Sequence, residues 1–492
     1  MNKLIDSALS QRLFVWLVLI TLLALGILAW LKTPIDAFPN VTSPQVKVIL
    51  KAPGMTPEEI ESRITALVET EMLGIAKQKT LRSMTKYALT DITVTFEDGT
   101  DIYWARQQVS ERLNGLRDKL PTGIEGGIAP PTTPLSDILM FTLDSPSLSL
   151  AERRQLLDWV IRPALRTVSG VADVNALGGE VRSYEVEPDP QRMVAHGISF
   201  AQLQTTLAEN NQNDGAGRLV EGEEVLIVRS LGSLTNTQVI ANLPIVRVNQ
   251  QAITVGDVAR VRMGSLTRYG GVTRNGEGET VQGIVLAMTG VDTKAVLNEV
   301  EKQLARLTPA LPESLSIQVF YHRGQLIDRA IATISEALLE AIALVLVLLI
   351  VFLGNWRAAL TVATLLPMAL IISFIWLYAM GISANLMSLG GLVIALGLIV
   401  DNGVVVVENM VHRLEQSPHQ RLPRLHLMAQ SVKEMAMPVG VGMTIIVLIF
   451  LPLLSLEDIE GNLFRPVALS IIFTLLSALF LALLVLPTIA AQ

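Results

Sequence analysis

The chain has 492 residues and a formal net charge of −7, and half of its residues are hydrophobic. Only 17% are charged, and the mean hydropathy is +0.47. These values lie between those of a soluble protein and a pure bundle of membrane helices, so we expect a mixed architecture. The negative charge argues against a nucleic-acid partner, and the lack of cysteine excludes disulfides and thiolate metal sites.

Six apolar runs are long enough to cross a bilayer. The first follows Lys3 and Arg12 and lacks a small-residue cleavage site, so we expect a signal anchor rather than a removed signal peptide. The polar segment between the first two runs is long enough for two or more soluble domains. The runs are Leu13–Leu31, Ala337–Leu353, Ala359–Tyr378, Leu386–Met410, Pro438–Leu454 and Val467–Leu486.

Basic residues near the ends of the runs set the expected orientation. Arg357 follows the second run, and Arg413, Arg421, Arg424 and Lys433 surround the loop after the fourth. These short loops and the N-terminus are therefore expected in the cytoplasm, which places the large polar segment on the other side of the membrane.

The polar segment reads as two successive units of strands and helices. In the first, Thr56 is expected to cap a helix that begins with Pro57. In the second, the helix is expected to carry Trp159 and Ile161 on its apolar side. The strands are predicted at Gln45–Ala52, Asp91–Phe96, Asp137–Leu143, Val171–Ala176 and Ser183–Val186, followed by a strand-rich stretch to about Ser265, and the helices at Asp101–Leu120, Ser149–Val168 and Phe200–Asn210.

Two β-α-β units with antiparallel potential predict split βαβ, ferredoxin-like modules. The expected fold is therefore a membrane bundle of six transmembrane helices joined to α+β ferredoxin-like modules. The predicted divisions are 1–32 for the N-terminal end and first transmembrane helix, 33–134 for the first module, 135–335 for the second module with additional strands, and 336–492 for transmembrane helices two to six.

Two carboxylates, Asp401 and Glu408, interrupt the fourth apolar run. A charged side chain near a bilayer centre costs several kcal/mol, so such residues are expected to be functional. Seven residues span two helical turns, about 10 Å of rise, and end about 20° from the same face. The pair therefore predicts a column of acids that relays protons or cations, which indicates a transporter and not an enzyme.

Other readings of the nearby residues stay open. Glu408 can be an interfacial carboxylate that reaches the headgroups, since it lies near the cytoplasmic end of the run with Arg413 only five residues on, and Asn402 can orient a water or a bond between helices. The glycines of this run favour close helix packing, and Met387 is a weak candidate for a soft-metal ligand among methionines that otherwise fill apolar gaps. The glycines are Gly390, Gly391, Gly397 and Gly403.

Several stretches resemble the resistance–nodulation–division (RND) efflux permeases, in particular their heavy-metal branch, over nearly the whole chain. They are PIDAFP from Pro34, FEDGTDIYWARQQVSERL from Phe96, DWVIRP from Asp158, VEPDPQR from Val186, FLGNWRAAL from Phe352 and NLMSLG from Asn385. The resemblance implies an inner-membrane proton antiporter with periplasmic porter modules, driven by the proton-motive force without another cofactor. It also implies a homotrimer that works with a periplasmic adaptor and an outer-membrane channel.

The chain departs from the family pattern in two ways. Family members resemble two such halves in tandem, and this chain corresponds to the N-terminal one, so a C-terminal half or second permease chain is an expected partner. Divalent-cation members carry a further aspartate where this chain has Ala395. The leading hypothesis is proton-driven efflux of heavy-metal cations or related toxic solutes. The alternatives are efflux of organic compounds and a non-transporting half that stabilises or regulates another permease.

Overall fold

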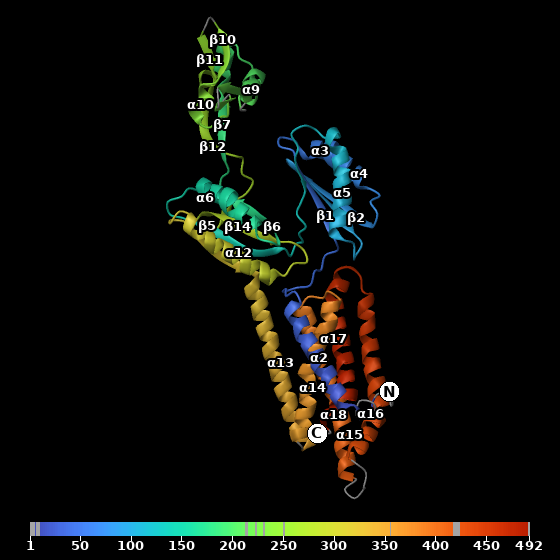
Figure 1. The fold of residues 1–492 in the computed structure, drawn as a ribbon. Helices are drawn as coiled ribbons and strands as arrows, with labels where there is room; N and C mark the ends of the chain where they lie inside the picture. Colours follow the sequence, from blue (N-terminus) through green and yellow to red (C-terminus); the bar gives the residue numbers. More distant parts are fainter. Residues whose placement is uncertain are drawn as a thin grey trace.

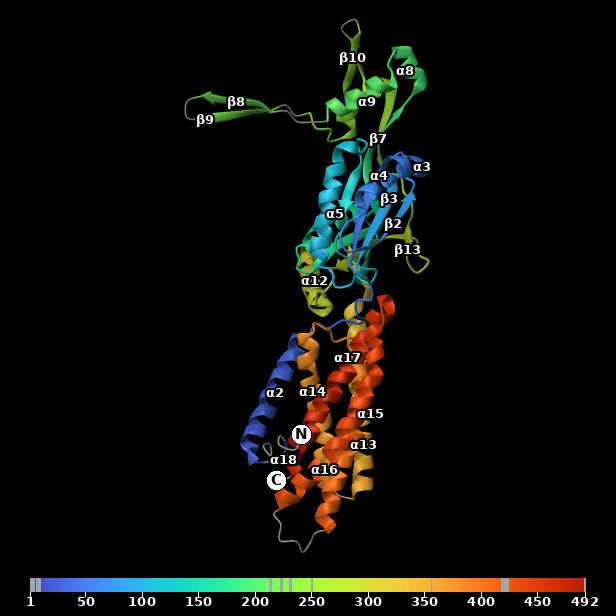
Figure 2. The same cartoon turned by 90° about the vertical axis from the view of Figure 1, so that its right-hand side faces the viewer.

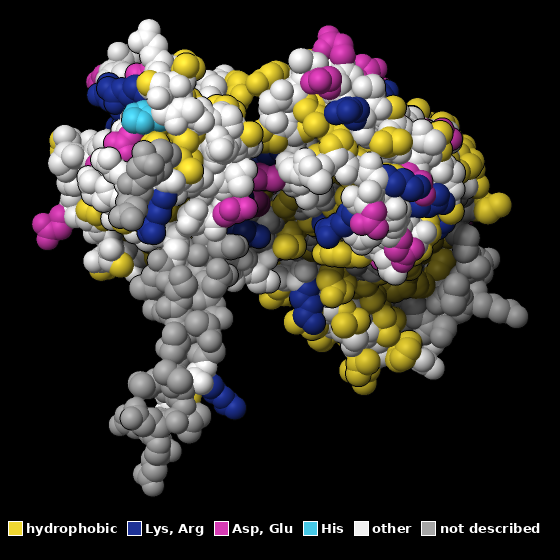
Figure 3. Space-filling model, turned by 90° about the horizontal axis from the view of Figure 1, so that it is seen from above, with side chains coloured by type: hydrophobic (Ala, Val, Ile, Leu, Met, Phe, Trp, Pro, Cys, Tyr) yellow, Lys and Arg dark blue, Asp and Glu magenta, His cyan; other side chains and the backbone are white. Residues whose placement is uncertain are grey.

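A computed structural model describes residues 5, 10–211, 215–221, 224–229, 232–248, 251–354, 356–416 and 424–490. A bundle of long helices forms one end of the molecule, two α+β units lie next to each other on top of it, and a lobe inserted in the second unit forms the far end (Figure 1). Viewed from that far end, acidic and basic side chains are interspersed over the upper surface (Figure 3).

Six helices within the described part of the chain are long and apolar enough to cross a membrane. The central helices α14, α15 and α17 pack on one another, whereas α2, α13 and α16 lie around them and bury far fewer residues. The sequence therefore placed the apolar runs correctly. The helices are α2 (Arg12–Lys32), α13 (Arg323–Leu353), α14 (Trp356–Ala379), α15 (Leu386–Gln416), α16 (Arg424–Phe450) and α17 (Asp458–Phe480), which continues through a π-helical turn, η6 (Leu481–Val485), into α18 (Leu486–Ala490).

The first α+β unit is a four-stranded antiparallel sheet in the order β2-β3-β1-β4, with helices on one face. Thr56 caps its first helix in a reciprocal capping box with Glu59, as the sequence predicted for the cap. The buried residues of β1 alternate with half-buried ones, and the buried ones seat one face of the sheet on the helices. The elements are β1 (Gln45–Lys51), α3 (Pro57–Ile60), η1 (Glu61–Thr65), α4 (Ala66–Met72), β2 (Gln78–Lys86), β3 (Leu89–Phe96), α5 (Ile102–Leu116) and β4 (Glu125–Ile128).

The second unit repeats this arrangement. Four strands of its five-stranded sheet follow the order β6-β14-β5-β15, which is the order of the first unit once the inserted lobe is set aside. The fifth strand, the short β13 (Val272–Thr273), also pairs with β14. Its helices cover one face of the sheet and form a separate core with it. The elements are β5 (Asp137–Asp144), α6 (Leu150–Leu156), η3 (Leu157–Ile161), α7 (Arg162–Arg166), β6 (Val171–Gly178), β14 (Glu279–Ala287), α12 (Thr293–Leu307) and β15 (Ser316–His322).

The inserted lobe lies between β6 and β14 and has a small core of its own. Figure 2 shows its β8–β9 hairpin reaching away from the remainder of the molecule. The elements are β7 (Arg182–Pro188), α8 (Pro190–His196), α9 (Phe200–Glu209), β8 (Gly215–Glu221), β9 (Glu224–Arg229), α10 (Thr237–Ala241), β10 (Pro244–Val248), β11 (Gln251–Thr254), α11 (Val255–Val258) and β12 (Ala259–Ser265).

The structure corrects one prediction about the second unit. Ile161 is fully buried, whereas Trp159 is 78% exposed, so the two do not share the apolar side of their helix. Two residues along a helix are about 200° apart, and the π-helical turn η3 covers both positions.

Candidate functional site

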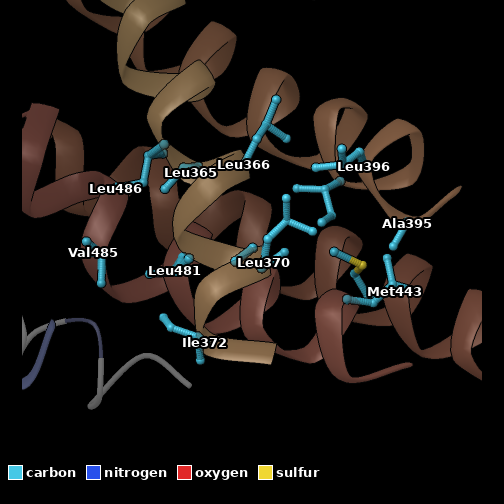
Figure 4. Close-up of a cluster of buried hydrophobic side chains, with 14 of the residues drawn as sticks. Leu365, Leu366, Leu370, Ile372, Ala395, Leu396, Met443, Leu481, Val485 and Leu486 are labelled. Atoms are coloured by element: carbon cyan, nitrogen blue, oxygen red, sulfur yellow. The ribbon is translucent and has the colours of Figure 1, made fainter. Parts of the chain in front are cut away.

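The centre of the helical bundle is apolar. Figure 4 shows Leu366 and Leu370 of α14, Ala395 and Leu396 of α15, and Met443 of α16 gathered in this core. Ala395 is completely buried. At the position where divalent-cation members of the resembled family carry an acid, this chain therefore contributes a methyl group to the apolar packing.

One stripe of α15 is exposed on the surface of the bundle. Ile394, Gly397, Val405 and Glu408 are exposed, and their spacing places them on one side of the helix. By the same periodicity the backbone position of Asp401 lies on that side, two turns before Glu408. The side chains of Asp401 and Asn402 lie outside the described residues, so the predicted column is placed here by its helix positions.

Arg413 forms its ion pair with a residue of α16 and not with Glu408. The Arg413 guanidinium pairs with the Glu434 carboxylate of α16, and its Nη1 donates to Gln430 Oε1 at 3.1 Å. Glu408 is exposed, and among the described side chains it has no hydrogen-bond or ion-pair partner. Its carboxylate is therefore available to a group outside this part of the chain.

The four glycines of α15 differ in their surroundings. A methyl group added at Gly391 would lie 2.7 Å from the carbonyl oxygen of Val467 in α17, and one added at Gly403 would lie 3.0 Å from Val362 of α14. At Gly390 and Gly397 an added methyl would meet no heavy atom within 4 Å. Neighbouring helices thus approach closely at Gly391 and Gly403, whereas Gly390 and Gly397 face open space.

Met387 lies in the first turn of α15, at the end of the bundle nearest the α+β units. Its backbone N–H donates to Asn385 Oδ1 at 2.9 Å, and Asn385 also accepts the N–H of Ser388 at 3.0 Å. Among the described residues no group of three or more His, Cys, Asp or Glu side chains could hold a metal ion. The hydrogen bond to Asn385 holds the backbone of Met387 in the first turn of α15.

No local sequence pattern indicates the polar joint between the bundle and the α+β units. Lys79 of β2 pairs with Asp458 at the start of α17, and this ion pair raises the pKa of Lys79. Arg323 at the start of α13 pairs with Asp36 just after α2. The partners of each pair are hundreds of residues apart, so local patterns carry no information about them.

A family model described as the AcrB/AcrD/AcrF family matches residues 4–492. The chain belongs to the AcrB/AcrD/AcrF family. This confirms the resemblance to the RND permeases, and named relatives confirm their heavy-metal branch. The cation efflux system protein CzcA of Alcaligenes sp. (strain CT14) is 36% identical over 505 residues, covering 100% of this chain and 47% of the relative.

Two further comparisons agree with this membership of the AcrB/AcrD/AcrF family. The cation efflux system protein CusA of Escherichia coli (strain K12) is 34% identical, covering 98% of this chain and 47% of CusA. A crystal structure of a heavy metal efflux pump superposes with a TM-score of 0.86 at 34% identity, covering 99% of this chain and 48% of that chain. The chain thus spans about half the length of the curated relatives it matches.

Proposed function

We propose that this chain forms part of a proton-driven permease that exports heavy-metal cations across the bacterial inner membrane. It would act as a secondary transporter, driven by the proton-motive force. Relatives at 34–36% identity are named for cation efflux, and one similar protein is named for cobalt, zinc and cadmium resistance. The observation that carries the proposal is the exposed stripe of α15, where Glu408 lies within a spanning helix and has no partner among the described side chains.

Proton coupling follows from the chemistry of that stripe. Asp401 and Glu408 are the acids that would take up and release protons, with Asn402 next to them. A carboxylate in a membrane span is costly when it faces lipid, so it usually faces other protein or a water-filled cavity. We therefore propose that further protein covers this stripe, supplied by a C-terminal half or a second permease chain.

The architecture supports porter modules outside the cytoplasm. Both α+β units have two helices on one face of an antiparallel sheet, and both have the strand order expected of a split βαβ module. We propose that they are ferredoxin-like porter modules in the periplasm and that the inserted lobe contains docking-type strands. A homotrimer working with a periplasmic adaptor and an outer-membrane channel is part of the same proposal.

Organic-compound efflux remains the second candidate. Buried Ala395 removes the acid that divalent-cation members carry, which leaves the class of exported solute open between monovalent metals, divalent metals and organic compounds. A transport assay with copper, silver, zinc, cobalt and a panel of dyes distinguishes them.

The relay is tested in the complete permease, with everted membrane vesicles and an imposed proton gradient. Asp401→Asn is expected to abolish metal uptake into the vesicles while membrane insertion and oligomer formation persist. Glu408→Gln should give a milder defect, because Glu408 lies nearer the end of α15. Glu336→Gln is the matched control, since Glu336 is an exposed acid on a different spanning helix, α13. Full uptake by Asp401→Asn would refute the relay.

A further inference from the structure

Arg323 is the first residue of α13, and its side chain is buried in the joint between the bundle and the second α+β unit, with 5% exposed. Its Nη2 lies 2.8 Å from Oδ1 of Asp36, in the segment after α2. Its Nη1 donates a hydrogen bond to the carbonyl oxygen of Leu135, just before β5. Because a buried guanidinium is costly unless its donors are satisfied, these contacts fix the start of α13 against both segments.

Asp36 connects the same ion pair to further elements. Its Oδ2 accepts a hydrogen bond from Thr293 Oγ1, at the start of α12, at 3.2 Å. Its backbone N–H donates to the carbonyl oxygen of Ala384 at 3.2 Å, and the N–H of Ala384 donates to the carbonyl oxygen of Pro34 at 2.9 Å. Ala384 lies between α14 and α15, so the ion pair joins four spanning helices to the second unit.

The α13 helix depends on this joint more than the central helices do. Only 6% of its apolar window is buried inside the structure, compared with 50% or more for α14, α15 and α17. Because α13 packs on α14 and α15 along one narrow face only, the contacts at its start contribute a large share of what holds it in place. The contacts of Arg323 therefore couple α13 to the second unit.

We propose that Asp36 and Arg323 are positioning residues for transport. The pair holds the start of α13, the end of α2 and the second α+β unit as one body, so that a rearrangement of the bundle is passed to that unit. This inference rests on the proposed function. A neighbouring pair, Lys294 with Asp328, also joins α12 to α13, but its side chains are 39% and 57% exposed, so it is the matched control.

The joint itself is tested by hydrogen exchange on the purified full chain in detergent. Arg323→Gln should speed exchange by about tenfold or more at the amides of Asp36 and Ala384, because loss of a charged hydrogen-bond partner costs at least that factor. Lys294→Gln should leave these amides unchanged. The double variant Asp36→Arg with Arg323→Asp exchanges the two charges and should restore part of the protection. Such a recovery would show that the faster exchange in Arg323→Gln does not come from loss of folding. Unchanged exchange in Arg323→Gln would refute the joint.

Its role in transport is tested in the complete permease by measuring metal export and proton entry in the same vesicles. Arg323→Gln should lower export about tenfold relative to the protons admitted, with partial recovery in the charge-exchanged variant. Lys294→Gln should keep the parent ratio. Faster exchange without any change in export would refute transmission through the pair. An unaltered permease that exports no metal would instead refute the proposed function, and the exchange result would still report on the joint.

Discussion

Arg162 opens α7 and binds Asp173 of β6 at two points. Its Nη2 lies 2.7 Å from Oδ2, and its Nε donates to Oδ1 at 3.1 Å. Burial alone would raise the pKa of Asp173, but hydrogen bonds from Arg162 and from the Val174 amide lower it below its ordinary value. The DWVIRP stretch that carried part of the family resemblance therefore contributes a contact that fixes a helix to the sheet of the second unit.

We expect Asp173→Asn to destabilise the second unit by about 1–3 kcal/mol at pH 7, because it leaves Arg162 without its charged partner. Since the folded pKa of Asp173 is lowered, its stabilisation is complete above the carboxyl's unfolded pKa of about 3.9 and is lost as the pH falls through the folded value. Melting temperatures at pH 7 and at decreasing pH measure this. Asp118→Asn, at an exposed position, is the control, and an equal loss at every pH would contradict the ionic explanation.

Gly391 and Gly390 are adjacent residues with opposite surroundings, which makes them a natural pair for testing helix packing. Gly391→Val should lower the melting temperature of the bundle, because the new side chain would overlap the backbone of α17 at Val467. Gly390→Val should be tolerated, since no heavy atom lies within 4 Å of an added methyl. Equal effects of the two substitutions would show that α15 and α17 do not approach each other closely at Gly391.

At the level of elements, the sequence predicted strands and helices wherever hydrophobic periodicity or caps were clear. Ser149 was placed at the start of its helix, and it forms a capping box with Glu152. β2 was missed, because its sequence QKTLRSMTK is polar and lies at the edge of the sheet, where most of its side chains are exposed. Trp159 and Ile161 are both apolar, but two positions along a helix differ by about 200°, so the two side chains cannot share one side.

The repeated strand order predicts that the inserted lobe can be removed. Gly178 of β6 and Val281 of β14 lie directly opposite each other in antiparallel register. Replacing residues 179–280 with Asn-Gly should therefore close a two-residue hairpin and leave the core of the second unit folded. A variant that removes residue 178 as well is the control, since a one-residue slip exchanges the two faces of a strand. Circular dichroism and thermal melting compare the two variants, and equal behaviour would contradict the shared architecture.

At the scale of the whole molecule, orientation is the most direct test. The chain contains no cysteine, so single cysteines can report it. Glu313→Cys in the second unit and Gln11→Cys before α2 are both at exposed positions. An impermeant maleimide should label intact spheroplasts at position 313 and reach position 11 only after the inner membrane is opened. The reverse pattern would overturn the proposed topology.

Long-range contacts determine what the sequence left undecided at this scale. The six spans and the two acids of α15 could be read locally, but the Asp36–Arg323 pair and the exposure of the α15 stripe depend on residues far apart in the chain. Hydrophobic periodicity specifies which residues favour an apolar environment. It does not specify whether lipid or protein covers them, and this distinction decides the role of Glu408.

The exposed stripe of α15 bears on whether this chain can transport by itself. Glu408 has no partner among the described side chains, and α13 and α16 present apolar faces beside the central helices. A carboxylate on such a face is costly unless other protein or a water-filled cavity covers it. We therefore expect residues 1–492 to insert and fold but to confer no metal or drug resistance alone. Resistance should return on co-expression with a matching C-terminal half.

The measurement is growth inhibition by copper, silver, zinc, cobalt and dyes, with and without that second half. Co-expression of the second half with residues 1–492 carrying Asp401→Asn should not restore growth. This result would separate transport from simple stabilisation. Resistance from the single chain, purified as a closed homo-oligomer, would show that two copies cover each other's α15 stripes. In that case the α15 acids of each copy would be covered by the second copy, and the transport site would form between the two.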